Sequence, residues 1–196
     1  NGFGVGSYTY MIEVLDKYGN PETDSVSISV VDTTDPIIMD SPTPKTVEYG
    51  YTGQSYSWTG TDLNPDTYTI ELLETGIVAG PLAWTSGIPI TYYIPDGFGV
   101  GTYSYQVIFS DQYGNDESDT VTFTVQDTGI PTILTAPDDE LLECGNLGPN
   151  LTWDVTDPYP GVYNITINSL PYVSNSPWFS GTPIEFDMAS LNLGVD

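Results

Sequence analysis

The sequence has no histidine, a single cysteine and only two basic residues among 196. Without histidine, the commonest general base, Cys–His nucleophilic pairs and Cys/His zinc sites are excluded. One cysteine cannot form a disulfide within the chain. The 27 acidic residues give a net charge of −25, which argues against nucleic-acid partners and docking on anionic membranes, because both require lysine and arginine. No apolar run approaches the roughly 20 residues of a membrane span, so we expect no direct membrane insertion.

The residues that are present indicate a folded, turn-rich protein rather than an acidic tail. Hydrophobic residues make up 39% of the chain and aromatic residues 13%, too much for disorder driven by charge. Twenty glycines and sixteen prolines imply many turns.

An internal repeat of about 95 residues organises the sequence. The segment 1–10, NGFGVGSYTY, recurs at 96–105 as DGFGVGTYSY. Trp58 recurs as Trp153 at the same offset of 95. A repeat of this length is a whole domain rather than a solenoid unit. The lone Cys144 corresponds to Tyr49 of the other copy, which favours a small buried residue over a reactive thiol.

Within the repeat, apolar residues alternate with polar residues, as Tyr103, Tyr105, Val107 and Phe109 do. A period of two with frequent turns predicts an all-β chain of tandem immunoglobulin-like β-sandwich domains, one complete and two partial. We expect strands A to G of the complete domain at 36–49, 55–61, 67–74, 77–84, 88–94, 101–110 and 117–126. Alternation places Trp58 in the core rather than on a ligand platform, and Tyr103 or Tyr105 is expected to form a tyrosine corner. The many tyrosines are interpreted as core residues rather than as a sugar site.

Several motifs resemble a known group of repeats. Gly101-Thr102-Tyr103 is followed by alternation to Asp111, by Gly114-Asn115 and by a Val-x-Phe-x-Val strand. Together with the Asp-Thr-Thr-Asp-Pro linker at 32–36, this resembles the PKD- and HYR-type immunoglobulin-like repeats of archaeal and bacterial cell-surface proteins. The resemblance implies an extracellular, cell-surface location and a role as a spacer, adhesive unit or fibre subunit.

The repeat is out of phase with the chain. We expect an F–G hairpin of an incomplete domain at 1–31, a linker at 32–35, a complete domain at 36–126, and strands A to E of another incomplete domain at 127–196. Each fragment contains the strands that the other lacks. One hypothesis is a structural subunit of an extracellular filament or surface layer, in which the hairpin of one copy completes the half-domain of the next, head to tail. The alternative is a window on a longer tandem array.

Acidic residues gather where the linker, the B–C loop and the F–G loop share one end of the sandwich. The candidate ligands there are Asp32, Asp35, Asp62 and Asp111, with Asn64 and Asn115 nearby. Hard oxygen ligands without a compensating basic residue suit Ca²⁺, and calcium would stiffen the linker as it does in cadherin-like arrays. The alternative is that Asp62 caps a turn and the other carboxylates are solvated.

The second junction carries Asp127 and Asp157, but Ile130 replaces the counterpart of Asp35. In the filament hypothesis, Asp16 of the incoming hairpin would join this pair in trans, and calcium would stabilise the joint between subunits.

Two N-glycosylation sequons begin at Asn150 and Asn164, and alternation turns both side chains outward. An enzyme would have to rely on carboxylates alone, and no pair of them forms a recognisable motif, so we predict no catalytic activity. The competing function is a carbohydrate- or partner-binding adhesin segment of a longer surface protein.

Overall fold

The computed structural model describes residues 2–143 and 146–190. The chain divides into two compact units, Asn1–Gln126 and Asp127–Asp196. The structure is all-β apart from one 3₁₀ turn, η1 (Met188–Ser190), among the described residues. None of the described helical segments is long and apolar enough to cross a membrane. The predicted packing of Cys144 lies outside the described residues.

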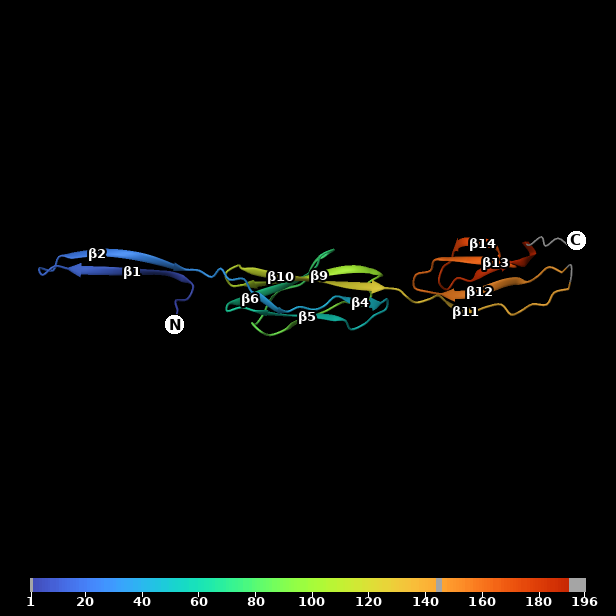
Figure 1. Ribbon diagram of the computed structural model, residues 1–196, viewed down its shortest axis with the longest axis horizontal. Coiled ribbons are helices and arrows are strands. Elements are labelled where there is room, and N and C mark those ends of the chain that lie inside the picture. The colour runs from blue at the N-terminus through green and yellow to red at the C-terminus, as the bar shows by residue number, and fades with distance from the viewer. Residues whose placement is uncertain (1, 144–145, 191–196) are drawn as a thin grey trace. The chain divides into compact units, whose positions relative to one another are not determined.

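The first part of the chain is a two-stranded hairpin, made by β1 (Gly6–Leu15) and β2 (Pro21–Val30) (Figure 1). Pairing runs without a bulge from Gly6↔Val30 to Leu15↔Pro21. Neither strand belongs to a sheet with any other described strand.

Two sheets form the central domain. The larger has the order β4-β10-β9-β6-β7 and the smaller the order β3-β5-β8. Their bounds are β3 (Ile37–Asp40), β4 (Lys45–Glu48), β5 (Ser55–Thr61), β6 (Pro65–Leu72), β7 (Gly76–Ala83), β8 (Ile90–Tyr93), β9 (Gly101–Asp111) and β10 (Asp116–Gln126). In immunoglobulin terms this is an A′-G-F-C-C′ sheet packed on an A-B-E sheet, so the predicted fold class is confirmed.

Two strand predictions were wrong in detail. The segment expected as strand D is β7, which pairs with β6 and therefore occupies the C′ position. A tight turn closed by Thr75 N–H donating to the Leu72 carbonyl (2.8 Å) returns the chain directly beside β6. The single strand A expected at 36–49 is split into β3 and β4, which lie in different sheets, because Pro42 and Pro44 interrupt the ladder.

The core fills the space between these two sheets and is rich in aromatic residues. Trp58 is completely buried, as predicted. The Tyr103 hydroxyl donates to the Gly99 carbonyl at 2.9 Å, which confirms the tyrosine corner. The hairpin repeats this bond one period earlier, since the Tyr8 hydroxyl donates to the Gly4 carbonyl at 2.9 Å.

The second unit repeats the A-B-E and C-C′ parts of this pattern. One sheet has the order β11-β12-β15, and β13 pairs with β14. Their bounds are β11 (Thr132–Thr135), β12 (Asn150–Thr156), β13 (Val162–Ile167), β14 (Leu170–Pro177) and β15 (Ile184–Asp187). We call this unit the half-domain, because no described strand in it occupies the F or G position. Residues 136–143, which include the counterpart of β4, form no strand.

Candidate functional site

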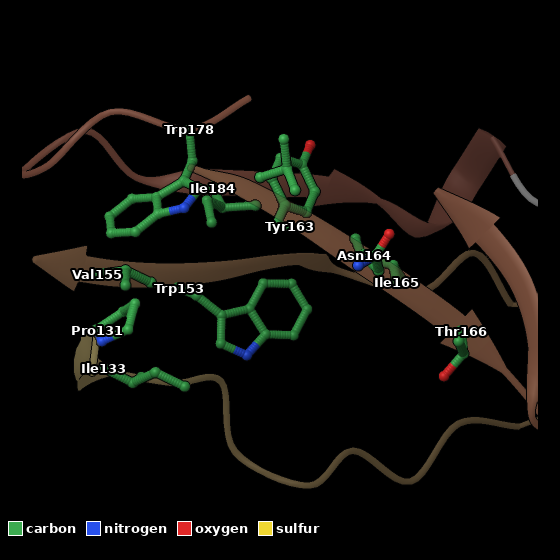
Figure 2. Close-up of a pocket in the computed structure, with 11 residues that line it drawn as sticks. Pro131, Ile133, Trp153, Val155, Tyr163, Asn164, Ile165, Thr166, Trp178 and Ile184 are labelled. Atoms are coloured by element: carbon green, nitrogen blue, oxygen red, sulfur yellow. The ribbon is translucent and has the colours of Figure 1, made fainter. Parts of the chain in front are cut away.

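An apolar groove of about 480 Å³ opens between the two sheets of the half-domain (Figure 2). We call it the acceptor groove. It is lined by Pro131, Ile133, Trp153, Val155, Val162, Tyr163, Asn164, Ile165, Thr166, Trp178 and Ile184. Figure 2 shows the Trp153 ring at its centre, between Ile133 and the strand that carries Tyr163. The groove is open and lined mainly by apolar residues, unlike the packed core of the central domain.

The central domain shows what normally fills this groove. Trp58, the counterpart of Trp153, is completely buried, whereas Trp153 is only half-buried. Strands β9 and β10 cover the corresponding space, and Phe109 packs edge-on against Trp84 with ring centroids 4.9 Å apart. The acceptor groove is therefore the space that the F and G strands occupy in the complete domain.

The polar groups of the groove are also left without partners. In the central domain, the Trp58 Nε1–H donates to Asp119 Oδ2 and the Trp84 Nε1–H to the Ser110 carbonyl, both at 2.9 Å. Within the described residues, Trp153 and Trp178 have no such acceptor for their indole N–H groups. Neither N–H group is among the fully buried unpaired atoms of the described residues, so both face the open groove and are available to an acceptor on a partner.

The hairpin exposes the complementary surface. Five apolar residues on one face, Tyr10, Ile12, Val14, Val26 and Ile28, are between 43% and 60% exposed. One period later, the counterparts Tyr105, Val107, Phe109, Val121 and Phe123 are at most 2% exposed. We call the first set the hairpin face. The same pattern of residues forms a core in one place and bare surface in the other.

A further residue of this face was missed by sequence reasoning. Asp24 stands in line with Val26 and Ile28, at the position that Asp119 takes in the central domain. It accepts no hydrogen bond from the described residues. The signal was available, because a carboxylate interrupts the apolar alternation at the same place in both repeats.

The linker lies where it was predicted, against the loops at one end of the central domain. Asn64 Nδ2 donates to Asp32 Oδ2 at 2.9 Å, and Asn115 Nδ2 lies 3.5 Å from the Asp32 carbonyl oxygen. Asp35 and Asp62 line one shallow depression of about 310 Å³. The linker and these two loops thus meet, and the side-chain amides of Asn64 and Asn115 join the loops to Asp32.

Asp111 caps the turn between β9 and β10. Its Oδ1 accepts the Tyr113 and Asn115 backbone N–H groups at 2.8 Å, and its Oδ2 accepts Asn115 Nδ2 at 2.7 Å. Burial alone would raise the pKa of Asp111, but these hydrogen bonds outweigh it and lower the pKa below its ordinary value of 3.8. Asp16 caps the hairpin turn in the same way with Tyr18 and Asn20, and the hydrogen bonds from Asn20 lower its pKa.

Three further candidate ligands also receive backbone N–H bonds. Asp62 Oδ1 accepts from Asn64 N at 2.6 Å, Asp127 Oδ1 from Gly129 N at 3.1 Å, and Asp157 Oδ1 from Tyr159 N at 2.7 Å. In the part of the chain that the structure describes, no three acidic side chains converge into a metal-sized group. Calcium binding stays a prediction.

Both sequon asparagines lie on exposed positions of their strands, as alternation predicted. Asn150 begins β12, and Asn164 lies in β13 with its Oδ1 accepting the Asn175 N–H at 2.8 Å. Glycosylation itself stays a prediction.

Comparison with protein-family models and with curated proteins finds no match. Among solved structures, the titin domains Z1Z2 in complex with telethonin are 11% identical over 72% of this chain and 73% of that chain, with a TM-score of 0.48. The N-terminal Ig1-2 module of the Drosophila receptor protein tyrosine phosphatase DLAR is 20% identical over 79% and 84%, with a TM-score of 0.39. A third is SGBP-B of the Bacteroides ovatus mixed-linkage glucan utilization locus, in complex with a heptasaccharide. It is 15% identical over 95% and 53%, with a TM-score of 0.26. These values carry no functional argument, and the immunoglobulin-like assignment rests on the strand order of the central domain.

Proposed function

We propose that this chain is a structural, immunoglobulin-like segment of a cell-surface protein that assembles head to tail by strand complementation. The observation that carries the proposal is the paired exposure of the hairpin face and the acceptor groove. Their counterparts, β9 with β10 and the sheet residues around Trp58, cover each other in the central domain. Two bare surfaces whose counterparts already fit together are a docking pair.

The geometry of such docking favours open chains. The donor is the hairpin at one end of the sequence and the acceptor is the half-domain at the other end, so the two contacting surfaces differ. Contacts of this heterologous kind propagate into filaments unless the rotation closes a ring. An isolated two-stranded hairpin is at best marginally stable in water, so docking would also stabilise the hairpin.

Calcium at the junctions is part of the proposal. The support is the position of Asp32 beside Asn64 and the shared depression lined by Asp35 and Asp62 at one end of the central domain, together with a net charge of −25 that repels neighbouring copies. In the joint, Asp16 of the incoming hairpin would approach Asp127 and Asp157, as predicted from the repeat. Ca²⁺ coordinates six to eight oxygens and neutralises such clusters.

The motifs that resemble PKD- and HYR-type repeats support an extracellular location and an archaeal or bacterial source, and we include both in the proposal, with N-glycans on Asn150 and Asn164. No catalytic role is included. The extracellular location is tested on the native protein. An antibody against the central domain should label intact cells, and glycan removal should shift the band that it detects to lower mass. No labelling of intact cells would contradict the surface location.

Assembly is tested by sedimentation velocity and electron microscopy of the purified chain. We expect filaments with an axial repeat of about two domains, and monomers after deletion of residues 1–31. Filaments that persist without these residues would contradict strand complementation.

The second candidate function is binding of a carbohydrate or another partner by an adhesin segment. The observation that favours it is the apolar groove with Trp153 and Trp178 in its lining, because aromatic rings stack on sugar faces. Binding of the unassembled chain on a glycan array, lost after Trp153→Ala, would support this function.

A further inference from the structure

We infer that the hairpin of a second copy docks in the acceptor groove in one register only, fixed by a size-matched valine pair and by two indole hydrogen bonds. The inference rests on the proposed head-to-tail assembly and specifies its joint. The template is the central domain, whose own hairpin, β9 and β10, already lies in the corresponding groove beside β6.

The register follows from the central domain when β6 is replaced by β13, one repeat later, and β9 is replaced by β1, one repeat earlier. In the central domain Ile70 pairs with Val107 and Tyr68 with Phe109. The corresponding pairs in the joint are Ile165 with Ile12, and Tyr163 with Val14. Strand β1 would then lie antiparallel to β13, and the joint sheet would have the order β2-β1-β13-β14. A slip by one residue would turn the whole hairpin face outward.

The size match distinguishes this joint from a generic apolar contact. In the central domain Gly60 lies under the Phe109 ring, and a Cβ at Gly60 would meet Phe109 Cδ1 and Trp84 Cζ3, each at 3.1 Å. The half-domain has Val155 at the position of Gly60, which leaves less room for a ring at the position of Phe109. The hairpin has Val14 at the position of Phe109. The larger residue in the groove is thus matched by a smaller residue on the hairpin, as close packing requires.

The polar match comes from the two indole groups. The two indole bonds of the central domain have counterparts in the joint. There the Trp153 Nε1–H donates to the Asp24 carboxylate, and the Trp178 Nε1–H donates to the Leu15 carbonyl. Each of these donors and the Asp24 carboxylate lacks a partner within the described residues. One docking event satisfies all of them, and a register shifted by two residues moves the Asp24 carboxylate away from the Trp153 indole.

The size match is tested by a double-mutant cycle on the full chain, read as the concentration at half-assembly in sedimentation velocity. Val14→Phe should weaken association about 5- to 150-fold, because overpacking typically costs about 1–3 kcal/mol and each 1.4 kcal/mol is a factor of ten. Val14→Phe combined with Val155→Gly recreates the central-domain pair and should recover most of the loss. Equal weakening in the single and the double variant would overturn the size match.

The polar match is tested by Asp24→Ala, which leaves the Trp153 donor unpaired. We expect association about 5- to 150-fold weaker, the range for an unsatisfied buried group, with partial recovery in Asp24→Asn. Glu13→Ala is the matched control, because it also removes one negative charge, but from the side of the hairpin opposite to the hairpin face. An Asp24→Ala variant that associates as tightly as Glu13→Ala would overturn the indole bond.

The register itself is tested by cross-linking in a Cys144→Ser background. Glu13→Cys with Asn164→Cys places two exposed positions opposite each other in the joint, matching Ile108 and Thr69 of the template. Oxidation should give a ladder of covalent oligomers. Glu13→Cys with Thr166→Cys, two positions away, should give little product.

The possible failures are separable. A wild-type chain that stays monomeric overturns both the proposed function and this joint. Assembly with cross-links only in the shifted pair, or only within one chain, overturns the joint and leaves assembly by another route.

Discussion

The central domain and the two fragments that flank it contain the same strand pattern in opposite situations. In the central domain, Val107 and Phe109 are completely buried, while their counterparts Ile12 and Val14 are more than half exposed. The strands, the tyrosine corner and the turn cap are nevertheless the same in both places. Local structure in this repeat is therefore encoded locally, whereas burial requires the matching half of the sandwich.

The largest effect that separates the two regions comes from a charge on the apolar face. Val107→Asp should destabilise the central domain strongly, because burying a carboxyl group without a partner costs about 2–7 kcal/mol of the roughly 5–15 kcal/mol that typically stabilises a domain. Ile12→Asp should leave the thermal unfolding of the central domain unchanged and abolish assembly. Circular dichroism and sedimentation velocity measure the two effects. Full assembly of the Ile12→Asp chain would show that the hairpin face is not an interface.

Calcium should have a smaller effect, which is to stabilise the junctions. Extracellular calcium modules bind with dissociation constants of about 0.1–1 mM, so about 10 mM Ca²⁺ should stabilise the junctions by about 1.4–2.7 kcal/mol. Isothermal titration should detect the heat of Ca²⁺ binding, and a titration with Mg²⁺ at the same ionic strength is the control. Asp32→Ala and Asp62→Ala should reduce this heat in the linker, and Asp157→Ala in the joint. Unchanged heats in all three variants would exclude these sites.

The turn cap gives a smaller, pH-dependent effect. Because the pKa of Asp111 is lowered in the folded state, its contribution is present above the ordinary pKa and is lost as the pH falls through the lowered folded value. Asp111→Asn should therefore flatten the acid side of the stability curve of the central domain below about pH 4 and cost about 1 kcal/mol at pH 7. Urea unfolding between pH 2 and 7 measures both. If the stability of Asp111→Asn fell with pH as steeply as that of the wild type, ionisation of Asp111 would not be coupled to folding.

The smallest effect is that of monovalent salt. Both partners are acidic, and the chain carries a net charge of −25, so screening should favour association. Raising NaCl from about 0.01 M to about 0.15 M shortens the Debye length from about 30 Å to about 8 Å, and we expect assembly a few-fold tighter. Weaker assembly at high salt would indicate that attractive ion pairs, rather than apolar burial, hold the joint.

Much of the fold could be predicted from the sequence, because alternation with a period of two and a repeat of about 95 residues locate the strands. The failures arose where pairing depends on connections. The short turn from Leu72 to Gly76 makes β7 a partner of β6, and the prolines at 42 and 44 divide the first strand. A periodic pattern shows which face is apolar but not which neighbour a strand selects.

The candidate site was predictable in part. The meeting of Asp32 with Asn64 and Asn115 follows from the loop geometry of a sandwich, but the sequence does not say whether an asparagine presents its oxygen to a cation or its N–H₂ group to a carboxylate. The structure has the N–H₂ groups on Asp32. The interrupted alternation marks the position of Asp24 in the sequence, but only the bond between Trp58 and Asp119 in the complete copy shows what a carboxylate at that position can bind.

Hydrogen exchange of the full chain, measured below and above its association concentration, tests the complementation of hairpin and half-domain most directly. We predict that the amides of β1, β2 and β13 exchange rapidly in the dilute chain and become as protected as those of β9, β10 and β6 on assembly. Residues 140–143 should gain protection with them, because their counterpart β4 is held by parallel pairing with β10. Exchange of these amides that stays rapid at every concentration, while β9 and β10 remain protected, would contradict the account.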